Sequence, residues 1–245
     1  MSVKLTKVLF TCLISLSFYS GISFAQIDTA AIVILDKMSD VVTGLESCSF
    51  TLKTEYDIYN IDLGLVKHSD EKKVFMKAPD KMMVSNKGDK GNKSLYYDGK
   101  TFTYYSADNN QYAAMPAPPT IMETIDSISN EYGVDFPAAD LFYEDLVDNI
   151  MENADAVAYL GITEAGEKEC HHVAGKNNEI TFQLWINVES FLPEKLVIVY
   201  TNKPANPQYL AVFADWKLNP SLENSMFIFS KPKDAVEIRF SKKQL

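Results

Sequence analysis

The sequence predicts an α+β protein in which one large, curved antiparallel sheet carries helices on its concave side. Three observations predict this class. The spacing of apolar residues is helical near the N-terminus, alternates over about 48–114, is helical again over 121–150, and then alternates almost to the end. No helical pattern follows each strand, which argues against a doubly wound parallel sheet. No linker or repeat divides residues 26–245, so we expect a single domain there.

The composition is that of an ordinary folded domain. Of the 245 residues, 47% are hydrophobic and 23% are charged, which excludes a disordered or low-complexity chain. The net charge of −10 opposes nucleic-acid binding, because such a surface repels a phosphate backbone. Arg239 is the one arginine of the chain, so bidentate recognition of anions by arginine has little support.

The first 25 residues are typical of a secretory signal peptide. Lys4 and Lys7 form a basic start, an apolar run covers 8–18, and residues 23–25 form a small-x-small cleavage site. The apolar run is shorter than the roughly 20 residues that span a bilayer, so cleavage is favoured over a membrane anchor. We therefore expect cleavage after Ala25, export to the periplasm and no transmembrane segment in the mature chain.

The first elements can be justified in order from residue 28. Asp28 can cap a helix that runs to about Leu45, because apolar residues recur there at helical spacing. Residues 48–58 alternate apolar with polar side chains, which predicts a strand with one buried face. Asp98-Gly99 lies between two aromatic runs and predicts a hairpin, since glycine accepts the positive φ of a tight turn. Further strands are expected at 61–68, 71–77, 81–86, 94–98, 101–106 and 111–114.

A helical segment separates these strands from a second group. Helical spacing places Ile121, Ile125, Ile128 and Tyr132 on one face of a first helix. A second helix is expected after Pro137, and its inward residues are Leu141, Phe142, Leu146 and Ile150. The alternating pattern then predicts strands at 156–163, 169–174, 179–188, 194–201, 207–217, 226–229 and 235–240.

Charge is distributed unevenly along the chain. Residues 101–167 contain 13 acidic residues and no lysine or arginine. A solvated helical surface explains such a segment, and so does a face that docks a basic protein partner. In the second case, we expect association to weaken with salt and anionic lipid head groups to be disfavoured beside this segment.

The sequence offers little support for catalysis. It lacks the G-x-S-x-G, H-E-x-x-H and G-x-G-x-x-G motifs. Cys170-His171-His172 is the densest cluster of candidate ligands or nucleophiles, and on a strand His171 faces away from the other two. With three histidines in the chain, we expect no metal site, no cofactor and no catalytic residue. Cys48 and Cys170 can form a disulfide in an oxidising compartment or pack as free thiols, and the sequence leaves both open.

A set of motifs spread over about residues 29–240 resembles one known family. The motifs are Lys77-Ala78-Pro79-Asp80-Lys81, Tyr97-Asp98-Gly99-Lys100, Tyr112 with Pro116, the run 132–141, Cys170-His171-His172, Gln183-Leu184-Trp185-Ile186, Leu192-Pro193-Glu194-Lys195-Leu196, Phe213-Ala214-Asp215-Trp216 and Phe227-Ile228-Phe229. They resemble an uncharacterised family of predicted periplasmic proteins, a domain of unknown function. That family is similar in fold to the outer-membrane lipoprotein carrier LolA, the receptor LolB and the stress sensor RseB.

The resemblance implies an incomplete β-barrel whose helices form a lid over an apolar cavity. It favours non-enzymatic binding or carriage of a hydrophobic ligand, a lipid or lipoprotein acyl chain. The alternative is a periplasmic sensor that docks a partner protein through the acidic lid region, and a hydrolase is a third hypothesis. The residues expected to line the cavity are Phe50, Leu52 and Tyr56 on the first long strand and Ile121, Ile125 and Ile128 on the first lid helix. These two faces can also pack together as a filled core, and the sequence does not choose between the two.

Overall fold

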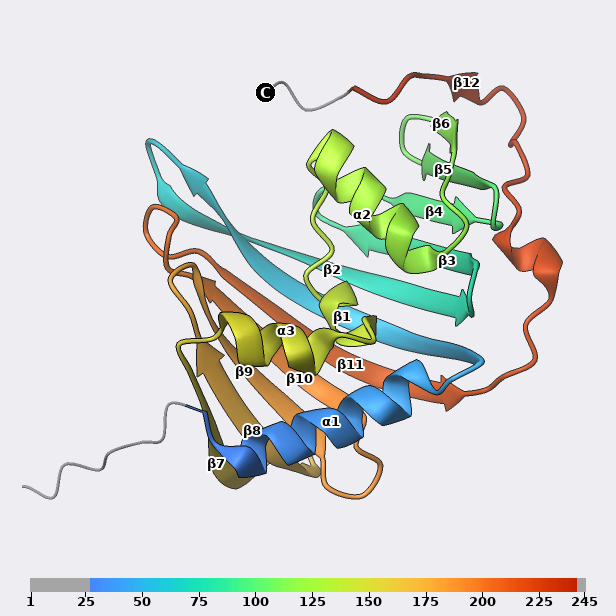
Figure 1. The fold of residues 1–245 in the computed structure, drawn as a ribbon. Helices are drawn as coiled ribbons and strands as arrows, with labels where there is room; N and C mark the ends of the chain where they lie inside the picture. The colour runs from blue at the N-terminus through green and yellow to red at the C-terminus, as the bar shows by residue number, and fades with distance from the viewer. Residues whose placement is uncertain (1–26, 242–245) are drawn as a thin grey trace, which may run out of the picture.

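The computed structural model describes residues 27–241, and the predicted signal peptide of residues 1–25 lies outside this range. Two groups of strands are separated by a helical segment (Figure 1). The first group follows a helix: α1 (Thr29–Thr43), β1 (Ser47–Asn60), β2 (Gly64–Lys77), β3 (Lys81–Gly88), β4 (Lys93–Tyr97), β5 (Thr101–Ser106) and β6 (Gln111–Pro116). The helical segment comprises α2 (Ile121–Tyr132), the 3-10 turn η1 (Ala139–Phe142) and α3 (Leu146–Asn153). The second group is β7 (Ala156–Ala165), β8 (Lys168–Lys176), β9 (Ile180–Asn187), β10 (Pro193–Tyr200) and β11 (Gln208–Leu218), followed by the 3-10 turn η2 (Asn224–Phe227) and β12 (Val236–Glu237).

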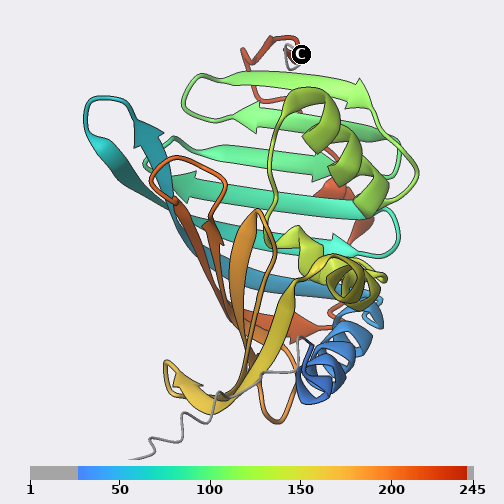
Figure 2. The ribbon, with the colours of Figure 1, turned by 60° about the vertical axis from the view of Figure 1, so that its left-hand side comes forward.

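All twelve of these strands belong to one curved sheet that does not close. Their order is β12-β6-β5-β4-β3-β2-β1-β11-β10-β9-β8-β7, so β12 and β7 form its two edges. Every pair is antiparallel except β12 with β6. Figure 2 shows the helices gathered on one side of the curved sheet. The predicted α+β class, a curved antiparallel sheet with helices on its concave side, is confirmed.

Helix α1 begins where the sequence predicts a cap. Asp28 accepts a hydrogen bond from the backbone N–H of Ala30 at 2.8 Å, which satisfies one of the unpaired donors of the first turn. Its second carboxylate oxygen accepts from the Tyr159 N–H at 3.2 Å, which ties the start of the helix to β7. The buried face of α1 consists of Ala31, Ile34, Leu35, Met38, Ser39 and Val42. Its apolar members pack into a core with strands β1 and β8–β11.

The hairpin predicted at Asp98-Gly99 joins β4 to β5. Gly99 has a φ of 91°, a conformation in which other residues are strained. The Asp98 carboxylate accepts hydrogen bonds from the backbone N–H groups of Lys100 and Thr101, at 3.0 and 2.8 Å. These bonds hold the turn in the geometry that aligns the two strands, so the prediction is confirmed.

The structure corrects five predicted elements, four strands and one helix. The strands expected at 61–68 and 71–77 are one strand, β2, which pairs with β1 from Gly64 to Lys77. Asp70 remains inside this strand because its carboxylate accepts a hydrogen bond from the Thr54 hydroxyl at 2.5 Å. The single helix expected after Pro137 is divided into η1 and α3, because the backbone at Tyr143 is extended. The strand expected at 226–229 is replaced by η2, and only two residues of 235–240 pair with β6.

The helices cover two different parts of the concave face. Ile121, Ile125 and Ile128 of α2 pack with Met82, Tyr97 and Phe102 on β3–β5. Helix α1, η1 and α3 pack instead with β1 and the strands of the second group. The views in Figures 1 and 2 agree that α2 lies over one half of the sheet and that α1 and α3 lie over the other. The segment between α2 and η1 crosses from one half to the other.

Candidate functional site

Five apolar side chains form a row across the concave face of strands β1–β5. The row consists of Phe50, Val74, Val84, Leu95 and Tyr104, and each residue pairs with the next across the sheet. Residues that are directly opposite in antiparallel strands have their Cβ atoms about 5 Å apart on the same face. The row is therefore a continuous apolar floor that none of these strands could build alone.

Helix α2 lies over this floor, and both of its ends are fixed. The Thr120 hydroxyl accepts a hydrogen bond from the Glu123 N–H at 3.3 Å, and the Glu123 carboxylate accepts from the Thr120 N–H at 3.2 Å. This reciprocal pair is a capping box. Gly133 ends the helix with a φ of 67°. Ile125 and Ile128 then project from the helix into the space above the floor.

The floor and the helix enclose a cavity of about 380 Å³. This volume lies within the range of roughly 300–1,000 Å³ that is typical of small-molecule sites. Beyond the floor, the apolar wall includes Leu52, Met76, Met82, Phe102, Met122, Ile125, Ile128, Tyr132, Phe136, Phe142, Tyr209 and Phe240. Hydrocarbon and aromatic groups make up most of the lining, so the space favours an apolar occupant over water.

One end of the cavity is polar. Cross-strand pairing places Lys72 opposite Leu52, Asn86 opposite Lys72, and Lys93 opposite Asn86. Lys72, Asn86 and Lys93 all line the cavity. Burial holds the pKa of Lys72 below its ordinary value and the charge of Lys93 adds to this effect, whereas the hydrogen bond and charge of Asp70 oppose it. The polar end therefore contains two cations, and one of them is poorly solvated.

Sequence reasoning missed this polar row, although part of its signal was present. Lys72 is in phase with Val74, and Lys93 is in phase with Leu95, so alternation alone assigns both lysines to the apolar face. A lysine at such a position suggests a snorkelling surface residue as readily as a site. The pairing register, which aligns the lysines across three strands, is what identifies the row.

Four of the six residues expected at the cavity are brought together there. Phe50 and Leu52 lie on the sheet side and Ile125 and Ile128 on the helix side. Tyr56 lies farther along β1, where its ring is 5.7 Å from the ring of His68.

Ile121, the other expected residue outside this cavity, is the first residue of α2. Its N–H donates to the carbonyl of Pro79 at 2.9 Å, which holds it near the turn between β2 and β3. There it lines a neighbouring pocket with Met76 and Cys48. Tyr56 and Ile121 thus share a face with cavity residues but lie beyond the two ends of the cavity.

A second cavity, of about 440 Å³, lies beside η1 and α3 and has an acidic wall. Asp126, Asp140 and Asp145 line it, opposite apolar residues of β9 and β10. The Tyr143 hydroxyl donates a hydrogen bond to Asp126 at 2.6 Å, which links η1 to α2. Burial raises the pKa of Asp140 to about 6, with further contributions from the charges of Asp126 and Asp135. Three acidic residues of the segment 101–167 therefore lie together along this wall.

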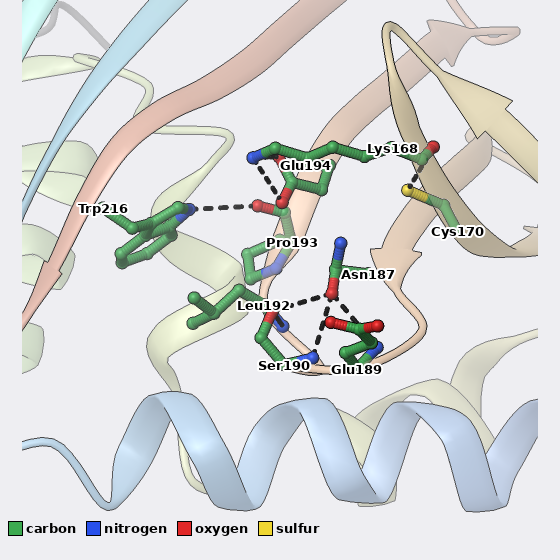
Figure 3. Close-up of polar contacts among 9 residues, drawn as sticks. All are labelled: Lys168, Cys170, Asn187, Glu189, Ser190, Leu192, Pro193, Glu194 and Trp216. Carbon is green, nitrogen blue, oxygen red and sulfur yellow. Dashed lines mark hydrogen bonds and ion pairs between the residues drawn. The ribbon is translucent and has the colours of Figure 1, made fainter.

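Cys48 and Cys170, the two cysteines within residues 27–241, are free thiols, so the disulfide considered between them is not formed. Strands β11, β10 and β9 separate β1 from β8, and adjacent strands lie about 4.8 Å apart. A disulfide requires Cα atoms within roughly 7 Å, so the sheet order prevents the bridge. The Cys170 thiol instead donates to the carbonyl of Lys168 at 3.6 Å (Figure 3).

The surroundings of the two thiols also argue against a nucleophilic role. Burial raises the pKa of Cys48 to about 12. The pKa of Cys170 is raised by burial and then by the charge of Glu194. In Figure 3 the Lys168 ammonium pairs with the Glu194 carboxylate, which accepts two hydrogen bonds of 2.8 Å from it. A thiol with a raised pKa remains protonated at neutral pH and is a weak nucleophile.

The two histidines of β8 lie on opposite faces of the sheet, and each contacts different neighbours. His171 lies 3.0 Å from the Tyr159 hydroxyl and stacks on Phe191. His172 lies 3.1 Å from the Gln183 side-chain oxygen and stacks on Trp185. Burial lowers the pKa of both imidazoles. Within residues 27–241, no three His, Cys, Asp or Glu side chains gather in a way that could hold a metal ion.

Comparison with known proteins relates the chain to one family and one type of fold. Residues 31–241 match the family described as "Predicted periplasmic protein (DUF2092)". No curated protein matches the chain. An uncharacterized conserved protein from Thermus thermophilus is similar in structure, with a TM-score of 0.50 and 14% identity, over 86% of this chain and 99% of that chain.

Two further solved structures are more distant. Lipoprotein LppX from Mycobacterium tuberculosis has a TM-score of 0.45 and 11% identity, over 80% of this chain and 98% of that chain. A LolA superfamily protein from Nitrosomonas europaea has a TM-score of 0.36 and 12% identity, over 81% of this chain and 97% of that chain. Across residues 27–241, none of the helices combines the length and apolarity needed to cross a bilayer.

Proposed function

The chain belongs to the DUF2092 family of predicted periplasmic proteins, and we propose that it binds or carries an acyl-chain-bearing molecule without catalysing a reaction. The match over residues 31–241 confirms the family resemblance seen in the sequence motifs. The observation that supports the proposal is the cavity of about 380 Å³ between strands β1–β5 and α2. Its long apolar lining fits a hydrocarbon chain, which gains free energy on leaving water in proportion to the area buried.

The family and the N-terminus together support a periplasmic location. The family is described as predicted periplasmic, and residues 1–25 carry the pattern of a cleaved signal. We expect the exported protein to begin at Gln26. Intact-mass measurement of periplasmic material checks this, and a mass that includes Met1 would contradict export by cleavage.

The test of the carrier function is displacement of a fluorescent fatty-acid probe from the purified protein. Leu52 is 5% exposed and lines the cavity, so Leu52→Gln places an unpaired amide where a hydrocarbon chain would lie. We expect the affinity for the probe to fall by about tenfold or more, since roughly 1.4 kcal/mol corresponds to each factor of ten. The matched control is Lys53→Gln, at the next position of β1, which is exposed on the other face.

Two outcomes would contradict the carrier function. If the wild-type protein binds no probe, the cavity does not accept acyl chains. If Leu52→Gln and Lys53→Gln bind the probe as the wild type does, the acyl chain of the probe binds outside this cavity. Urea unfolding of both variants separates a loss of binding from a loss of folding, because a folded Leu52→Gln protein retains a cooperative transition.

A sensor that docks a basic partner is the second candidate function. The observation that favours it is the acidic segment 101–167, which includes α2, η1 and α3. Its carboxylates Asp126, Asp140 and Asp145 line the second cavity beside these helices. A ligand that moves α2 would also move Asp126, so binding in the first cavity and docking at this wall can be coupled.

A further inference from the structure

We propose that the row formed by Lys72, Asn86 and Lys93 recognises a lipid head group that carries a phosphate next to a hydroxyl or ammonium donor. The inference rests on the proposed function, because the acyl chain of the same molecule would occupy the apolar part of the cavity. It extends that function by naming the ligand as a single-chain phospholipid-type amphiphile. Three features of the row support head-group recognition: its position, its unpaired acceptor and its charge.

The row lies at the end of the cavity where the head group of such a molecule would be placed. The row is next to the apolar floor on the same face of the sheet. Lys72 is two residues before Val74 on β2, and Asn86 is two residues after Val84 on the antiparallel strand β3. The next row contains Asp70 and Thr54, and neither lines the cavity. The change from hydrocarbon to polar lining therefore occurs once, at one end, as in a site for an amphiphile.

Asn86 carries an acceptor without a donor. Its Oδ1 atom is buried and has no hydrogen-bond partner, and in the part of the chain that the structure describes it is the single side-chain atom of this kind. A buried acceptor without a donor destabilises a protein, because its hydrogen bond to water is lost and not replaced. A hydroxyl or ammonium group of a ligand in the cavity would supply the missing donor.

The two lysines supply the charge. Lys72 is already engaged: its ammonium donates to Asp70 and, at 3.1 Å, to the Thr54 hydroxyl. Lys93 forms no ion pair with any residue between 27 and 241. Hydrogen bonds from Asn92 lower the pKa of Asp108, and the charge of Lys93 makes a smaller contribution in the same direction. Lys93 is therefore the cation that remains to pair with a ligand.

An anion at this end would relieve the repulsion between the two lysines. The half-buried Lys72 and its neighbour Lys93 repel each other, and a phosphate between them would attract both. Adjacent strands lie about 4.8 Å apart, so the lysine backbones are separated by roughly twice this distance across Asn86, a gap that their long side chains can close on one phosphate. Lysine binds phosphate as a point charge, so no arginine is required.

The expectation that anionic head groups are disfavoured applies only to the acidic segment. That expectation depends on the charges of residues 101–167, and Lys72 and Lys93 both precede this segment in the sequence. Asp135 is the one acidic residue of the segment that lines this cavity. The lysine row therefore provides the anion with a site of its own within the same cavity.

The test compares three amphiphiles with sixteen-carbon chains as competitors of the fatty-acid probe. Palmitoyl lysophosphatidylglycerol has a phosphate and hydroxyl donors, monopalmitoylglycerol has donors without charge, and hexadecylphosphocholine has a phosphate without a donor. We expect lysophosphatidylglycerol to bind most tightly. Lys93→Gln should weaken it about tenfold and leave monopalmitoylglycerol within twofold, because the substitution removes a charge-assisted hydrogen bond to the phosphate that the uncharged ligand cannot form.

Three variants complete the design. Lys93→Arg keeps the charge and should restore most of the lysophosphatidylglycerol affinity. Asn86→Leu should weaken the two ligands that carry a donor and leave hexadecylphosphocholine within twofold. Lys87→Gln, next to Asn86 on β3 but exposed on the opposite face, is the matched control and should bind all three as the wild type does.

The outcomes distinguish this inference from the proposed function. Equal affinity for all three amphiphiles, unchanged in Lys93→Gln, would overturn head-group recognition while the carrier function remains. Binding of none of them would overturn both. Displacement of the probe by glycerol phosphate, which has the head but no chain, would assign the row to a free phosphate ester and would overturn the lipid assignment.

Discussion

Asp140 is the carboxyl whose titration we expect to affect stability most clearly. Its pKa is raised to about 6, first by burial and then by the charges of Asp126 and Asp135. A carboxyl whose pKa is higher in the folded than in the unfolded state stabilises the fold when protonated, and this contribution is lost as pH rises from about 4 through 6. The folded protein should therefore gain stability on mild acidification at this position.

Asp140→Asn checks this linkage. The amide keeps the shape and removes the charge, so we expect the free energy of unfolding at pH 7.5 to rise over the wild type, by about 1 kcal/mol or less because Asp140 is exposed and solvent screens the charges around it. The difference should become small near pH 4, where the wild-type carboxyl is protonated. Urea denaturation at both pH values is the measurement, and Asp148→Asn, at an exposed position of α3, is the control. A difference that does not depend on pH would contradict the assignment.

Individual residues also show what the sequence could predict about the site. Phe50 and Leu52 could be identified because strict alternation fixes which side chains share a buried face. Tyr56 obeys the same alternation but lies beyond the end of the cavity, and alternation carries no information about where a cavity ends. Lys72 and Lys93 become neighbours through the pairing of β2, β3 and β4, which one-dimensional periodicity does not contain.

Among the elements, α2 depends on its cap. The capping box of Thr120 and Glu123 satisfies donors of the first turn, and the helix covers the apolar floor. We expect Thr120→Ala to lower the free energy of unfolding by about 1 kcal/mol. Ser129→Ala, within the same helix and away from the cap, should change it by less than about 0.5 kcal/mol. Urea unfolding measures both effects. If the two substitutions lower the free energy of unfolding equally, the capping box makes no specific contribution to stability.

The elements were predicted unevenly, for physical reasons. Helix α1 and the Asp98-Gly99 turn carry local signals, a capping carboxylate and a residue that tolerates positive φ, and both are confirmed. The polar positions 69–70 of β2 suggest a break, but a hydrogen bond from Thr54 of the neighbouring strand keeps them in the ladder. That stabilisation is tertiary, so a local pattern cannot reveal it.

At the scale of the whole molecule, the acidic segment predicts how a partner would associate. If the wall near Asp126 and Asp145 docks a basic protein, a lysine-rich peptide should bind and its association should slow as ionic strength rises from roughly 0.05 to 0.5 M, where the Debye length shortens from about 14 to 4 Å. Asp148→Lys combined with Glu152→Lys, two exposed positions of α3, should weaken binding further. Association that is insensitive to salt and to these substitutions would leave the segment as a solvated surface.

The order of strands across the sheet has a consequence for the speed of folding. Strands β1–β6 and β7–β11 are each meanders whose neighbours are close in sequence, whereas β1 and β11 pair across most of the chain. A hydrogen bond from the Glu46 N–H to the Asn219 side chain at that junction spans 173 residues. Closing so long a loop is entropically costly, and such non-local contacts slow folding. The two meanders can therefore form early and independently, and we expect pairing of β1 with β11, which places the cavity residue Leu52 opposite Phe213, to limit the rate at which the sheet is completed.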